Sequence, residues 1–176
     1  MNTRHRLHAR KRYLSLGLGE LTSAAVFAVV AVVGITPRLA SSTTAVLALW
    51  CALVPLLLVL VQAGAYWLLA RGWVGVGPMP SQLARLYRLF LVVDPLLLLV
   101  GLVGVLVWWP DELLAALLVM GVWLFGVIEY LNYFVVRLSY PASEWFARVR
   151  ERRRPRLMKD VGLAGRSTER RAVARR

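Results

Sequence analysis

Four long apolar runs constrain this chain more than any other feature of its sequence. They cover residues 16–36, 45–69, 86–109 and 113–136. A bilayer core about 30 Å thick needs roughly 20 apolar residues for one helical span, so each run is long enough to cross a membrane. Helix is the expected state, because an open sheet would leave backbone groups unpaired in hydrocarbon. The sequence therefore predicts an all-α membrane protein with four transmembrane helices in an up-down bundle.

Composition supports this interpretation. The chain has 176 residues and is 59% hydrophobic. A soluble domain of this size cannot bury that much apolar surface, so lipid must cover much of it.

The distribution of charge favours one orientation of the four spans. Residues 1–13 contain five basic side chains, whereas the loop between the third and fourth runs carries Asp111 and Glu112 without a base. Basic residues concentrate in cytoplasmic loops. We therefore expect a multi-pass protein of the plasma membrane with both termini in the cytoplasm. A cleaved signal peptide is disfavoured, because Arg38 occupies the −3 position of the small-residue cleavage candidate.

The chain divides into four parts by composition. A basic amino terminus (1–13) precedes a four-span domain (14–140), and a basic amphipathic helix at the membrane surface is expected over 141–154. Residues 155–176 are charged and poor in bulky apolar side chains, so we expect disorder there. The side chains expected to contact anionic phospholipid headgroups are Trp145, Phe146, Arg148, Arg150, Arg152, Arg153 and Arg154.

The net charge of +13 does not by itself indicate a nucleic-acid partner. The excess lies in the segments that the orientation places in the cytoplasm, where basic residues contact anionic lipid. We expect the lipid bilayer as a partner, with a membrane-protein partner or a second copy of the chain, and no nucleic acid.

Polar residues within the apolar runs form the main candidate site. Counting the helix rise from the basic end of each span places Gln62, Asp94 and Glu129 at roughly 12–14 Å, in one layer. Arg88 and Arg137 start at the same rim and are candidate partners for the acids. The candidate layer consists of Glu20, Gln62, Asp94, Glu129, Asn132, Arg88 and Arg137.

Two interpretations of this layer remain open. Paired acids hold helices in register, whereas unpaired acids form proton or cation sites. Pro95 strengthens the second interpretation, because it lacks the amide hydrogen that would bond the Leu91 carbonyl and so leaves an acceptor beside Asp94.

Signatures of catalysis and metal binding are weak. The sequence contains no HExxH, GxSxG or P-loop motif, and the histidine pair His5 and His8 lacks a third ligand. The single cysteine, Cys51, has no partner for a disulfide within the chain. We expect no enzymatic activity, no cofactor and no metal site.

Residues 128–141, with Glu129, Asn132, Tyr133 and Arg137, resemble the end of small uncharacterised multi-pass membrane proteins of bacteria. In those proteins an acid-Tyr-x-Asn-Tyr-Phe segment closes the last span. The resemblance implies a bacterial plasma membrane and implies no activity. Four spans with an acid in the first, here Glu20, are also similar in layout to small multidrug transporters.

Two functions are therefore considered. The first is a non-enzymatic accessory or scaffold protein that binds a membrane protein or anionic lipid. The second is a small proton- or cation-coupled transporter that uses the carboxylate layer. Transport requires a carboxylate that water reaches, whereas a structural pair is sealed from water.

Overall fold

The computed structural model describes residues 3–136 and 155–173, and every regular element in these two ranges is helical. Four helices in these ranges are long and apolar enough to cross a membrane, and each contains most of one predicted apolar run. The elements are α1 (Thr3–Val29), the π-helix η1 (Val30–Ile35), α2 (Thr36–Leu39), α3 (Thr43–Trp73), α4 (Ser81–Val107), α5 (Leu113–Tyr130), the π-helix η2 (Leu131–Val135) and α7 (Arg156–Val173).

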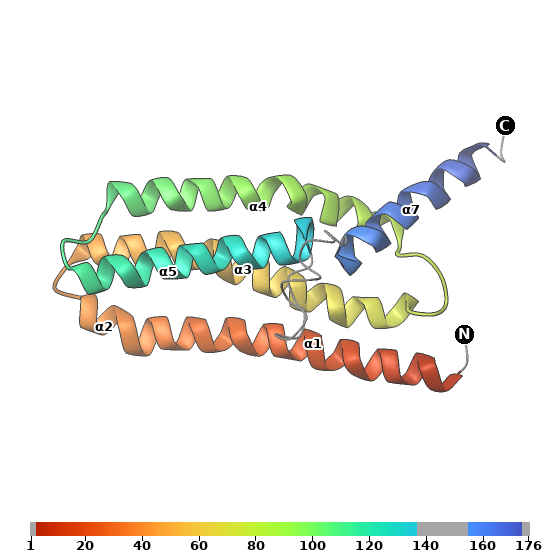
Figure 1. Ribbon diagram of the computed structural model, residues 1–176, viewed down its shortest axis with the longest axis horizontal. Coiled ribbons are helices and arrows are strands. Elements are labelled where there is room, and N and C mark those ends of the chain that lie inside the picture. The colour runs from red at the N-terminus through yellow and green to blue at the C-terminus, as the bar shows by residue number, and fades with distance from the viewer. Residues whose placement is uncertain (1–2, 137–154, 174–176) are drawn as a thin grey trace, which may run out of the picture.

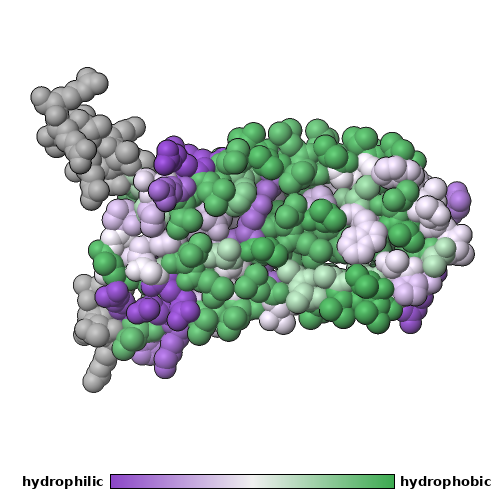
Figure 2. Space-filling model, turned by 180° about the vertical axis from the view of Figure 1, so that it is seen from behind, coloured by the Kyte–Doolittle hydropathy of each residue, from purple (hydrophilic) through white to green (hydrophobic). Residues whose placement is uncertain are grey.

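The long helices form an elongated bundle in which successive helices run in opposite directions (Figure 1). Helix α3 is central, because it contacts α1, α4 and α5. Apolar side chains cover the middle of the molecule and polar ones gather toward its two ends (Figure 2). This distribution is typical of a protein whose middle lies in hydrocarbon.

Small residues let the helices approach closely. A Cβ atom added to Gly17 of α1 would lie 2.8 Å from the Leu68 side chain and 3.0 Å from the Gly64 carbonyl of α3. A Cβ atom on Gly101 of α4 would lie 2.5 Å from the Cys51 carbonyl. Such contacts stabilise membrane helices by close van der Waals packing.

The connection between the first two spans differs in detail from the sequence expectation. Ser42 caps α3, since its hydroxyl accepts from the Ala45 amide at 3.3 Å. The first helix does not end at Thr36, however. A π-helical segment leads without a break into α2, and Pro37 lies in the first turn of α2.

Helix α7 corrects the expectation of disorder over residues 155–176. Residues Arg156–Val173 are helical, and Leu157, Val161 and Ala164 are buried at helical spacing. The helix contacts α4 and η2. The segment is highly charged overall, so its composition predicts disorder although a narrow apolar stripe is present. The amphipathic helix expected over 141–154 lies outside the described residues.

Candidate functional site

The predicted polar layer separates into two groups. The first joins α3 to α4: Gln62 donates its side-chain amide to Asp94 at 3.0 Å. Asp94 is only 1% exposed. In addition, the Tyr87 hydroxyl donates to the Gln62 backbone carbonyl at 2.9 Å. Asp94 is therefore buried inside the bundle, and Gln62 beside it is half-buried.

The second group lines a cavity of about 400 Å³. Glu20 enters it from α1, Glu129 from α5, and Asn132 and Tyr133 from η2. Both carboxylate side chains are only partly buried. Similar depth therefore did not place all the acids together, because helix rotation directs Asp94 toward α3 and the other two into the cavity.

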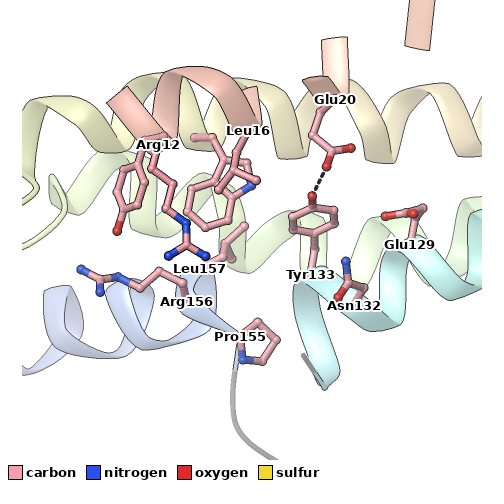
Figure 3. Close-up of a pocket in the computed structure, with 11 residues that line it drawn as sticks. Arg12, Leu16, Glu20, Glu129, Asn132, Tyr133, Pro155, Arg156 and Leu157 are labelled. Carbon is pink, nitrogen blue, oxygen red and sulfur yellow. Dashed lines mark hydrogen bonds between the residues drawn. The ribbon is translucent and has the colours of Figure 1, made fainter. Parts of the chain in front are cut away.

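The Tyr133 hydroxyl donates to the Glu20 carboxylate across this cavity (Figure 3). The π-helical turn η2 carries Tyr133 and Asn132, and π-helical turns are frequent at functional sites. The side chain of Asn132 interacts with Glu129. Each carboxylate thus has a polar neighbour that orients it toward the cavity.

Aromatic and basic side chains complete the lining. Tyr13, Leu16 and Trp67 form part of the wall, and the rings of Tyr13 and Trp67 meet edge to face at 5.0 Å between centroids. Arg12 and Arg156 lie on the side away from the two carboxylates (Figure 3). The cavity is therefore acidic on one side and basic on the other.

The first turn of α7 closes part of the cavity. Pro155, Arg156 and Leu157 line it, and the next turn is held by Asp160, which is 6% exposed. Asp160 accepts from the Tyr66 hydroxyl at 2.9 Å and the Trp73 indole at 3.1 Å, and pairs with Arg156 at 3.3 Å. These contacts fix α7 against α3.

The expected arginine partners do not match this geometry. Arg88 is exposed, and its Nε donates to the Ala84 carbonyl of its own helix at 3.3 Å. Arg137 and the seven expected lipid-contact residues from Trp145 to Arg154 lie outside the described ranges. Within those ranges, the ion pair of Arg156 with Asp160 lies on α7 and not in the predicted layer.

The Leu91 carbonyl, which Pro95 leaves without its helical donor, accepts a hydrogen bond from another helix. The Tyr130 hydroxyl of α5 donates to the Leu91 carbonyl at 2.9 Å. Pro95 lies inside α4, so this hydroxyl replaces the helical hydrogen bond that proline cannot make. Here the freed carbonyl joins two helices and does not face the cavity lined by the acids.

Sequence reasoning did not single out several residues of the site. The basic amino terminus contributes Arg12 to the cavity, and the second apolar span contributes Trp67. The segment for which the sequence predicts disorder contributes Arg156. For Asp160, the sequence contains a signal that predicts a buried, partnered acid. It is an acid inside an apolar stripe, and a buried acid needs partners.

The described residues contain no group of three or more His, Cys, Asp or Glu side chains that could hold a metal ion. The cavity can bind a ligand by charge, hydrogen bonds and aromatic contact. In comparisons with known proteins, no family model, no curated protein and no solved structure matches the chain.

Proposed function

We propose that this protein is a small multi-pass membrane protein that binds protons or small cations at Glu20 and Glu129, as the binding step of transport. One observation carries the proposal: carboxylates from two separate helices line the same cavity of about 400 Å³. This geometry favours the transport interpretation of the sequence, since a carboxylate used for transport must be reached by water.

The energetics of the cavity support binding of a positive charge. An ionised acid inside a span costs about 2.5–3.5 kcal/mol on insertion scales unless it is paired, protonated or hydrated. Tyr133 supplies one hydrogen bond to Glu20, but a hydroxyl carries no compensating charge. A proton or cation between the two acids reduces their repulsion and offsets their desolvation.

The charge distribution supports a cytoplasmic opening. The cavity is lined by α1 residues between Arg12 and Glu20 and by the start of α7. In Figure 1, α7 lies at the same end of the bundle as the N-terminus of α1. The basic residues of 1–13 favour a cytoplasmic position for that end in the plasma membrane. In this orientation the cavity receives its ligand from the cytoplasm or the inner leaflet.

The proposal is tested by flux into proteoliposomes that contain the full-length protein. A pH gradient, then gradients of NaCl, KCl and MgCl₂, are applied to the wild type and to Glu20→Gln and Glu129→Gln. We expect flux for at least one ion and a loss of at least about tenfold in each variant, the effect of roughly 1.4 kcal/mol. Glu112→Gln, in the loop before α5, is the matched control and keeps the flux. No flux of any of these ions in the wild type would contradict the proposal.

An accessory role is the second candidate, and the packing of α1 favours it. The first span is the least buried of the four, and large apolar side chains such as Val26, Val29 and Val33 are exposed on it. Another membrane protein could cover this face. Co-purification of one stoichiometric partner from native membrane in mild detergent, combined with an absence of flux, would favour the accessory role.

A further inference from the structure

The hydrogen-bonded pair of Gln62 and Asp94 has two buried oxygen atoms without a partner in the described part of the chain. Gln62 Nε2 donates to Asp94 Oδ1 at 3.0 Å. The remaining oxygens of the same two groups, Gln62 Oε1 and Asp94 Oδ2, are both buried and have no hydrogen-bond partner among the described residues. Both are acceptors if Asp94 is ionised. A buried acceptor without a donor is costly, and a buried charge without a partner is more so.

Neighbouring helices do not supply the missing donor. On α5, the Tyr130 hydroxyl donates to the Leu91 carbonyl. On α4, the Tyr87 hydroxyl donates to the Gln62 backbone carbonyl, and Arg88 is exposed and donates to the Ala84 carbonyl.

The titratable groups that come from the other packed elements are also engaged. On α3, the Tyr66 hydroxyl donates to Asp160 of α7, and Asp160 in turn pairs with Arg156. Each of these donors and cations, all from elements packed around the α3–α4 contact, thus has a partner of its own.

We propose that Asp94 and Gln62 form a buried proton-binding site, in which Asp94 is a neutral carboxylic acid. The proton on Asp94 Oδ2 donates to Gln62 Oε1, while Gln62 Nε2 donates to Asp94 Oδ1. A carboxylic acid and a primary amide can share two such hydrogen bonds in one ring. A single proton therefore satisfies both orphan oxygens and removes the buried charge. No other ligand of the site is needed.

This site is separate from the cavity of Glu20 and Glu129 and does not depend on its function. It makes the polar contact between Gln62 of α3 and Asp94 of α4 conditional on a bound proton. Loss of that proton would leave an unpaired charge on a side chain that is 1% exposed. Release of the proton therefore requires water or a cation to enter between the two helices.

Infrared spectroscopy of the full-length protein in lipid nanodiscs at neutral pH tests this inference. A protonated carboxyl has a C=O stretch that an ionised carboxylate lacks, and carboxyl-¹³C aspartate shifts the bands of Asp94, Asp111 and Asp160 only. We expect one protonated aspartate band, which Asp94→Asn removes and Asp111→Asn leaves. Glu20→Gln and Glu129→Gln should also leave it, so failure here and failure of the cavity proposal are distinguishable.

Two results would overturn the inference. The first is the absence of a protonated aspartate band from the wild type, and the second is a band that persists in Asp94→Asn. If that variant does not fold, the carboxyl ¹³C shifts of labelled wild-type protein decide between a neutral and an ionised Asp94. A Na⁺-dependent shift of those signals would assign a metal cation in place of the proton and would also reject the inference.

Discussion

The Tyr133 hydroxyl couples the Glu20 carboxylate to the π-helical turn that ends α5. Tyr133→Phe removes this donor and leaves a partly buried carboxylate with less compensation. We expect the variant to lose about 1.5–3 kcal/mol of stability, the range for a hydrogen bond to a charged group. Thermal unfolding in detergent measures the loss, and the flux assay measures its effect on the cavity.

Tyr130→Phe is the matched control for that substitution. It also removes a tyrosine hydroxyl from the end of α5, but its partner is the Leu91 carbonyl and not a cavity acid. Both variants should lose stability, whereas only Tyr133→Phe should change the ion dependence of flux. Equal effects on flux would mean that Tyr133 contributes packing alone.

Residue by residue, the sequence indicated which side chains are polar inside the spans but not which of them meet. Depth follows from counting 1.5 Å per residue, and on this basis Asp94 and Glu129 belong to one layer. Partners depend also on the rotation of each helix about its axis. Depth alone therefore does not predict that the Gln62–Asp94 pair and the cavity acids lie in different places, and only the structure shows it.

Helix α4 contains Pro95, and the Leu91 carbonyl that this proline cannot bond accepts a hydrogen bond from α5. Tyr130→Phe should leave the Leu91 carbonyl without a donor, at a cost of about 1–3 kcal/mol. Pro95→Ala restores an amide hydrogen four residues after Leu91. In the Pro95→Ala background, Tyr130→Phe should therefore cost less.

Chemical or thermal unfolding of the four proteins in this double-mutant cycle gives the coupling free energy between Pro95 and Tyr130. We expect a coupling of 0.5 kcal/mol or more, within the range of about 0.5–3 kcal/mol found for contacting residues. Additive costs would show that Tyr130 does not compensate for the proline.

Helix α7 depends on Asp160 for its position. Asp160→Ala removes the acceptor for Tyr66 and Trp73 and the partner of Arg156. We expect faster hydrogen exchange over residues 156–164, with the exchange of α3 to α5 near their middles unchanged. Asp160→Asn keeps an acceptor oxygen and should show a smaller effect. Exchange that is equal in wild type and Asp160→Ala would contradict the anchoring role.

The elements themselves were largely predictable, and the exceptions have physical causes. Four apolar runs longer than a bilayer needs leave little choice but four long helices. Charged composition predicts disorder for this segment, whereas helix formation depends on a short apolar stripe: Leu157, Val161 and Ala164 are buried, and Met158 packs beside them. The first helical span continues past Pro37 through a π-helical segment. No sequence pattern in that segment predicts a π-helix.

One end of the bundle holds α7, the N-terminus of α1 and the segment between α3 and α4 (Figure 1), and the first turn of α7 at this end lines the cavity. The apolar middle of the molecule lies between its two more polar ends (Figure 2), and the end opposite α7 holds the connection between α4 and α5 (Figure 1). Orientation in the membrane therefore decides which compartment would supply the cation that we propose for Glu20 and Glu129. The sequence predicts the cytoplasm, because the basic residues lie at the cavity end.

Cysteine labelling checks this orientation in a Cys51→Ala background, in which the native thiol is absent. Single cysteines are introduced as Gly77→Cys, Glu112→Cys and Arg176→Cys, and Gly77 is exposed with open space around it. A membrane-impermeant maleimide should label Glu112→Cys in intact cells and label the other two only after lysis. The physical reason is that arginine-rich segments are retained on the cytoplasmic side, whereas an acidic loop without a base crosses the membrane. Labelling of Gly77→Cys or Arg176→Cys from outside intact cells would reverse the orientation and place the cavity of Glu20 and Glu129 on the external face.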